Sequence, residues 1–147
     1  MLGTFTLAAI VLAVDRLSKW WVVRTFDLGD SLPLIPGIFH LTYVRNTGAA
    51  FSLFPGGTVL LAVFSALVVT GILIFARRIH ALGIGAELGL ILGGGLGNLV
   101  DRVREGGVVD FLDFRVWPVF NLADTALVIG VLIVGYRLWR GQEPDAA

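Results

Sequence analysis

Two aspartates, Asp110 and Asp124, are the residues whose type and setting could do chemistry. They lie fourteen residues apart in a chain that is 56% hydrophobic. An ionised Asp at the centre of a membrane helix costs roughly 2.5–3.5 kcal/mol on insertion scales, so a carboxylate near hydrocarbon usually has a task. Two carboxyl groups in contact cannot both ionise cheaply, so one keeps a proton. Such a pair could activate water with one member and protonate a carbonyl oxygen or a leaving amine with the other.

The spacing alone does not bring the two carboxyl groups together. Asp110 could be a surface loop residue and Asp124 a polar anchor at the end of a helix, so both interpretations stay open. Asn121 precedes Asp124 by three residues and shares its helical face. Its amide could therefore orient the carboxylate or hold a substrate carbonyl.

Composition places these residues in a membrane protein. Mean hydropathy is +0.87, well above that of an ordinary soluble domain, which is about half apolar. The balance of 11 basic and 11 acidic residues gives no reason to expect a nucleic-acid partner. With no cysteine and only His40 and His80 as imidazoles, disulfides and thiol chemistry are excluded, and we expect neither a metal nor another cofactor. The start of the chain has no basic region and no small-residue cleavage site, which predicts a retained span rather than a signal peptide.

The elements that must position the aspartates follow from the apolar runs. With about 20 residues needed per span, the 147 residues predict one membrane domain, 1–147, that is mainly α-helical with four transmembrane helices. Pro118 is expected to open the fourth helix, which would place Asp124 about 9 Å along its axis. Residues 108–114 read as strand-like. The predicted ranges are 2–24, 56–76, 82–101 and 118–139 for the spans, about 31–52 for a strand region between helices 1 and 2, and 140–147 for a flexible tail.

Glycines recur every four residues in the third span, at Gly85, Gly89, Gly93 and Gly97. This pattern predicts a face on which another helix packs closely. The run Gly93–Gly97 is not followed by Gly-Lys-Ser/Thr, so a phosphate loop is not predicted.

Charge counting leaves the orientation in the membrane open. Four spans with short loops put both termini on one side. The termini side holds four basic residues and the other side seven, which would place the termini outside. Several of the seven, however, lie within a helical turn of an acidic residue and could belong to a folded site.

Five motifs in order make the chain resemble the lipoprotein signal peptidase family, signal peptidase II. The match spans nearly the whole chain and is far more specific than any single motif. The motifs are Asp15-Arg-Leu-Ser-Lys19, Asn46-Thr-Gly48-Ala-Ala-Phe51, Gly97-Asn98-Leu-Val-Asp101-Arg102, Val108-Val-Asp110-Phe111 and Phe120-Asn121-Leu-Ala123-Asp124.

The resemblance implies an aspartic endopeptidase that removes signal peptides from bacterial prolipoproteins, cutting before a diacylglyceryl-modified cysteine of the substrate. It implies that Asp110 and Asp124 are catalytic. The residues implied to line or support the site are Asp15, Lys19, Asn46, Gly48, Asn98, Asp101, Arg102, Asn121 and Ala123.

The same resemblance implies a location and partners. It places the chain in the bacterial inner membrane as a multi-pass protein, with both termini cytoplasmic and the site at the extracytoplasmic leaflet. The expected partners are diacylated prolipoproteins, membrane lipids and the cyclic peptide inhibitor globomycin, and we expect a monomer. The strand region would form a small extracytoplasmic sheet, with Phe39, Leu41 and Tyr43 as a lipid-facing row.

Two other functions fit parts of the sequence. A proton-coupled transporter could use Asp15, Glu87 and Asp124 as a relay, although most carboxylates gather at one predicted interface and only Glu87 lies near the other. A noncatalytic assembly subunit could use the glycine face to bind a partner.

Overall fold

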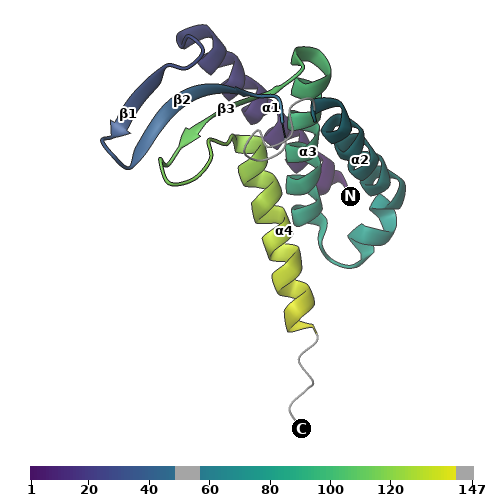
Figure 1. Ribbon diagram of the computed structural model, residues 1–147. Coiled ribbons are helices and arrows are strands. Elements are labelled where there is room, and N and C mark those ends of the chain that lie inside the picture. Colours follow the sequence, from purple (N-terminus) through teal and green to yellow (C-terminus); the bar gives the residue numbers. More distant parts are fainter. Residues whose placement is uncertain (49–56, 142–147) are drawn as a thin grey trace.

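The computed structural model describes residues 1–48 and 57–141. The helices lie side by side and a small sheet lies across one end of them (Figure 1). The expected class, mainly helical with a small sheet, is confirmed. The elements are α1 (Leu2–Thr25), β1 (Ser31–Ile35), β2 (Phe39–Asn46), α2 (Thr58–Ala81), α3 (Gly85–Glu105), β3 (Val108–Asp113) and α4 (Leu122–Arg140).

Two of the helices are long and apolar enough to cross a membrane. They are Thr58–Arg78 within α2, with mean hydropathy 2.8, and Leu122–Arg140, with mean hydropathy 1.6. Helices α1 and α3 have 24 and 21 residues, which also suffices for a bilayer core of about 30 Å at a rise of 1.5 Å per residue. They are less apolar because they carry charged side chains that the fold buries, such as Lys19 and Asp101.

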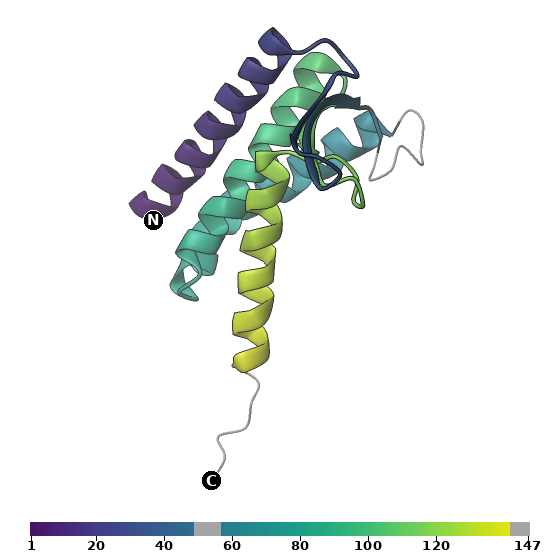
Figure 2. The same ribbon diagram turned by 90° about the vertical axis from the view of Figure 1, so that its left-hand side faces the viewer.

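Helix α3 is the centre of the helical layer, and its glycines allow this. A Cβ on Gly89 would lie 2.8 Å from the backbone oxygen of Thr4, and one on Gly93 would lie 2.7 Å from that of Ala8. The predicted glycine face is therefore confirmed as a packing face, and α1 occupies it (Figure 2). Because this face is already covered, it offers no surface to an assembly partner.

The sheet joins segments that are distant in the sequence. Its order is β1-β2-β3, with both pairs antiparallel, and Val44 of β2 lies opposite Asp110 of β3. The prediction that the sheet is formed by the segment between helices 1 and 2 was therefore incomplete, because its third strand, β3, comes from the segment between α3 and α4. Pairing with β2 holds β3, the strand that carries Asp110, across the end of the helices (Figure 1).

The predicted lipid-facing row is wrong. Tyr43 is 6% exposed and packs with Val22, Val109 and Phe111 in a core that attaches the sheet to α1, with Leu41 against it. A register shift between Leu41 and Val44 interrupts the simple alternation that the prediction assumed. The exposed apolar residues belong instead to β1 and the hairpin after it, namely Leu32, Leu34, Ile35 and Ile38.

Helix α4 begins at Leu122, so the predicted start at Pro118 is wrong. Phe120 is held in extended backbone by Leu112 of β3, whose N–H donates to the oxygen of Phe120 at 2.8 Å and whose oxygen accepts the N–H of Phe120 at 3.0 Å. Asp124 is thus in the first turn of the helix and not 9 Å along it. Positions 49–56 of the predicted strand region and second span, and 142–147 of the predicted tail, lie outside the described residues.

Candidate active site

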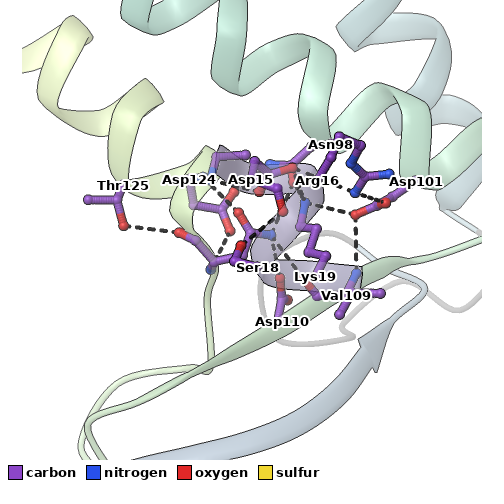
Figure 3. Close-up of polar contacts among 12 residues, drawn as sticks. Asp15, Arg16, Ser18, Lys19, Asn98, Asp101, Val109, Asp110, Asp124 and Thr125 are labelled. Carbon is purple, nitrogen blue, oxygen red and sulfur yellow. Dashed lines mark hydrogen bonds and ion pairs between the residues drawn. The ribbon is translucent and has the colours of Figure 1, made fainter. Parts of the chain in front are cut away.

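The fold brings Asp110 and Asp124 to one cavity of about 280 Å³ at the junction of the sheet and the helices. Asp110 comes from β3 and is 2% exposed, and Asp124 comes from the first turn of α4. Figure 3 shows both side chains in one cluster of polar contacts. The cavity is lined by Asn46, Gly48, Arg102, Asp110, Trp117, Pro118, Val119, Phe120 and Asp124.

Asn121 connects the two carboxyl groups and starts the helix that carries one of them. Its Nδ2 donates to Oδ1 of Asp110 at 2.7 Å. Its Oδ1 accepts the backbone N–H of Asp124 at 2.9 Å, and Oδ2 of Asp124 accepts the backbone N–H of Asn121 at 3.2 Å. This reciprocal capping box satisfies two backbone donors that the helix end would leave free. The cap that begins α4 therefore also fixes the relative position of the two carboxyl groups.

Two further amides hold the outer oxygens of the pair. Nδ2 of Asn98, from α3, donates to Oδ1 of Asp124 at 2.7 Å. Nδ2 of Asn46, from β2, donates to Oδ2 of Asp110 at 3.1 Å. The backbone N–H of Gly48 in turn donates to Oδ1 of Asn46 at 3.1 Å, which orients that amide. Among residues 1–48 and 57–141, each carboxyl oxygen thus has one donor, and its second lone pair can accept a proton or water.

The environment of Asp110 favours its neutral form. Burial, and secondarily the negative charge of Asp124, raise the pKa of Asp110 to about 7, against the opposing hydrogen bonds from Asn46 and Asn121. At neutral pH the Asp110 carboxyl therefore retains a proton for much of the time. Asp124 lies at the N-terminus of α4, where the helix dipole stabilises negative charge.

A buried ion network supports the pair from beneath. Nζ of Lys19 lies 2.9 Å from Oδ2 of Asp15 and 2.8 Å from Oδ2 of Asp101, and it donates to Oδ1 of Asn98 at 3.1 Å (Figure 3). Asp15 and Lys19, four residues apart on α1, thus form a buried ion pair. Lys19 thereby ties α1 to α3 and positions the amide that holds Asp124.

The same network reaches the backbone of the elements that carry the catalytic candidates. Oδ1 of Asp15 accepts the N–H of Ala123 at 3.1 Å, and Oδ2 of Asp101 accepts the N–H of Val109 at 3.3 Å. Ala123 is fully buried, and a Cβ added at Gly97 would lie 3.1 Å from the Cβ of Ala123. Position 123 must therefore be small, which explains why an alanine belongs to this site.

Sequence reasoning missed two sets of residues around the site. Arg16, which pairs with Asp101, was not singled out although it lies inside the Asp15–Lys19 motif. An apolar groove of about 440 Å³ adjoins the polar cavity, and Asp124 lines both. In the sequence, the apolar type of the groove residues is the only signal for this groove. The groove is lined by Phe114, Trp117, Phe120, Asp124, Thr125, Val128 and Ile129.

Glu87, the remaining member of the predicted proton relay, lies at the other end of α3. It is 3% exposed, and its Oε1 forms an ion pair with Nη2 of Arg137 at 3.0 Å. Asp15, in turn, is bound to Lys19 and Ala123. Within residues 1–48 and 57–141, no group of three or more His, Asp or Glu side chains is arranged to hold a metal ion.

The geometry suits acid–base hydrolysis, and the class it defines is the aspartic-type membrane hydrolase: two carboxyl groups line one cavity that is large enough to admit water, and one keeps its proton near neutral pH. A family model described as "Signal peptidase (SPase) II" matches residues 7–140. The chain belongs to the signal peptidase II family.

Relatives and solved structures agree with this assignment. The chain is 43% identical to the lipoprotein signal peptidase of Halothermothrix orenii, covering 95% of this chain and 97% of the relative, and 48% identical to that of Moorella thermoacetica, covering 94% and 97%. Its fold is similar to two solved structures, each described as a bacterial membrane enzyme. One has a TM-score of 0.87 at 28% identity, covering 98% of this chain and 93% of the other, and the second has 0.82 at 30%, covering 92% and 91%.

Proposed function

We propose that this chain is an aspartic endopeptidase that removes signal peptides from bacterial prolipoproteins, cutting before the diacylglyceryl-modified cysteine. Family membership supports the substrate class. The observation that carries the mechanism is that the carboxyl groups of Asp110 and Asp124 line one cavity and are joined through Asn121.

Roles for the two aspartates follow from their surroundings. Asp124, in the first turn of α4, takes a proton from water as the water oxygen attacks the scissile carbonyl carbon. Asp110, protonated because it is buried, gives its proton to the carbonyl oxygen. Asp110 then takes a proton from a hydroxyl of the tetrahedral gem-diol intermediate as the C–N bond breaks, and Asp124 gives the proton that it took from water to the leaving nitrogen. One water is consumed and the dyad returns to a single shared proton.

The apolar groove next to the dyad suits a substrate that stays in the bilayer. It shares Trp117, Phe120 and Asp124 with the polar cavity. A lipidated peptide could therefore keep its apolar part among Phe114, Val128 and the other groove residues while its scissile bond reaches the carboxyl groups.

We further propose that residues 1–147 form one membrane domain whose four helices all cross the bacterial inner membrane, as a monomer with both termini in the cytoplasm. The buried pairing of the charged residues in α1 and α3 supports this, because it removes those charges from the lipid-facing surface. The site would then face the extracytoplasmic leaflet, where the exposed apolar residues of β1 would rest on the membrane surface.

The test is cleavage of a diacylated prolipoprotein by purified protein in detergent. We expect wild-type protein to cleave it, globomycin to inhibit cleavage, and Asp110→Asn and Asp124→Asn each to lose essentially all activity while still accumulating in the membrane. Each variant lacks one of the two acid–base groups, and such a group typically accelerates a reaction by roughly 10²–10⁴-fold.

Asp113→Asn is the matched control. Asp113 lies on the same strand as Asp110 and is also buried, but its carboxylate is bound by Thr42 at 2.7 Å and by Arg115 at 2.9 Å, away from the cavity. This variant should cleave at close to the wild-type rate. Full activity in Asp110→Asn or in Asp124→Asn would refute the assignment.

A further inference from the structure

A second polar cavity lies on the other side of the Lys19–Asp101 pair from the candidate active site. Its volume is about 430 Å³, and none of its lining residues also lines the Asp110–Asp124 cavity. It is formed by the C-terminal halves of α1 and α3, which pack side by side (Figure 2), together with one residue of β3. Its lining residues are Arg16, Leu17, Lys19, Trp20, Val23, Arg24, Asp101, Arg104, Glu105 and Val109.

This cavity carries an excess of positive charge. Of its cations, Lys19 and Arg16 are paired with Asp101 (Figure 3). Its other carboxylate, that of Glu105, lies 3.3 Å from Arg45, which is outside the cavity. Within the described parts of the chain, Arg24 and Arg104 have no carboxylate partner. Two guanidinium groups thus remain for an anion.

An apolar track runs from these arginines along α1. Leu17, Trp20 and Val23 recur at intervals of three residues on one side of the helix and are 66%, 59% and 43% exposed. The guanidinium of Arg24 lies over the Trp20 ring, 5.7 Å from its centroid. At 1.5 Å per residue the track extends about 10 Å from Arg24 to Leu17. Tryptophan beside arginine is typical of the level of lipid headgroups.

We propose that this cavity binds an anionic glycerophospholipid, with the phosphodiester between Arg24 and Arg104 and an acyl chain along Leu17, Trp20 and Val23. The arginines and the apolar track are arranged in the same order as the headgroup and acyl chain of such a lipid. The headgroup would lie toward the sheet and the acyl chain toward the middle of the helices. The diacylglyceryl group of a prolipoprotein carries no phosphate, so it would not satisfy these arginines. The site is therefore separate from the one proposed for the substrate.

A bound lipid here would touch the supports of the candidate active site. Arg16 and Lys19 line the cavity and also hold Asp101, and Lys19 donates to Asn98, which donates to Asp124. The lipid would therefore bridge α1 and α3 at the level where these helices position the amide of Asn98.

The test measures lipid retention on the full chain by native mass spectrometry, after equal exposure in detergent to phosphatidylglycerol or phosphatidylcholine. Wild-type protein should retain phosphatidylglycerol in preference to phosphatidylcholine. Because each basic residue at a membrane surface contributes roughly a fivefold gain in binding of anionic lipid, the Arg24→Gln/Arg104→Gln variant should lose about twentyfold or more of that retention. Each single variant should show an intermediate loss, which gives a result even if the double variant accumulates poorly.

The matched control is Arg77→Gln/Arg140→Gln, which removes two exposed arginines from the opposite end of the helices. It should retain phosphatidylglycerol as the wild type does. Equal retention by the Arg24 and Arg104 variants, an equal loss in the control, or equal retention of phosphatidylcholine would each overturn the proposal. Displacement of the lipid by inorganic phosphate at matched concentration would show that the site takes a free anion, and would overturn the lipid assignment too.

Discussion

At the scale of single residues, amides hold the carboxyl oxygens of the site directly. Asn46, Asn98 and Asn121 each donate to one of the two catalytic candidates. An amide donor fixes a carboxyl oxygen without adding the full charge that would hold both acids ionised. The pair can therefore share one proton while its geometry stays fixed.

The pH dependence of cleavage should report this shared proton. The pKa of Asp110 is raised to about 7, so the carboxyl holds its proton below that pH and loses it above. If Asp110 is the acid, cleavage should fall as pH rises through about 7, with an apparent pKa that belongs to the pair. Initial rates at saturating substrate between pH 5 and 9 measure it.

Asn46→Val provides the accompanying control for this profile. The Asn46 hydrogen bond lowers the pKa of Asp110, so its loss should move the falling limb of the profile to higher pH. Activity that increases steadily from pH 6 to 9 in the wild type would contradict the role of Asp110 as the acid.

At the scale of elements, close helix contacts and buried ion pairs set where the site residues lie. Helix α3 touches α1 through one glycine face and α4 through another, and Asn98 lies between them with contacts to both Lys19 and Asp124. A small displacement of either neighbouring helix would change the distances within the dyad.

Adjacent glycines of α3 offer a sharp test of this packing. A Cβ on Gly94 would overlap the backbone oxygen of Ala123 next to Asp124, whereas one on Gly95 would meet only Cγ2 of Val69 at 3.4 Å. Gly94→Ala should lower both the melting temperature and the cleavage rate. Gly95→Ala should be neutral or stabilising, because alanine is favoured over glycine in a helix by about 1 kcal/mol. Thermal unfolding in detergent and cleavage assays compare the two, and equal behaviour would contradict the proposed contact.

Lys19 is the residue whose loss should affect the supporting elements most. Lys19→Met would remove the buried cation that contacts Asp15 and Asp101 and leave them only the partly exposed Arg16. Breaking a buried pair costs about 3–5 kcal/mol. We expect a large fall in melting temperature. The double variant Lys19→Met/Asp15→Asn should recover part of it, since one of the two buried negative charges is gone and the new amide oxygen at position 15 can still accept the N–H of Ala123. A single variant as stable as the wild type would show that the network carries little stability.

At the scale of the whole molecule, the two ends of the helical layer differ in kind. One end of the layer holds the sheet (Figure 2), both polar cavities and most of the buried charged groups. The other end holds the pair of Glu87 and Arg137. A hydrolase acting at a membrane surface needs its water-accessible chemistry at one face only. This polarity fits the proposed orientation, with the sheet outside the cytoplasm.

Labelling of single cysteines can test that orientation, because the chain has no cysteine of its own. Val116, in the connection from β3 to α4, is 92% exposed, and Leu82, between α2 and α3, is 73% exposed. A membrane-impermeant maleimide added to intact cells should label Val116→Cys, and it should label Leu82→Cys only after the membrane is opened. The reverse pattern would place the site in the cytoplasm.

Much of this molecule can be read from the residues in order. Apolar runs predicted the helices, and four-residue spacing predicted the glycine face. These features succeed because they depend on neighbours within a turn or two of one helix. Matching five ordered motifs to a family supplied the candidate dyad, which the spacing of Asp110 and Asp124 could not.

The tertiary structure decided what depends on contacts between distant segments. Strand β2 pairs with β3, which lies more than sixty residues later in the sequence, and this pairing places Asp110 over the helices. The two backbone hydrogen bonds between Leu112 and Phe120 keep this segment extended, so α4 begins only after its N-cap residue, Asn121. It also turned Tyr43 inward and opened a second, basic cavity between α1 and α3. The sequence determined which residues could do the chemistry, because that is a property of side-chain type. Only the folded chain decided that they line one cavity and that Asp110 is buried, because burial and proximity arise from packing between elements.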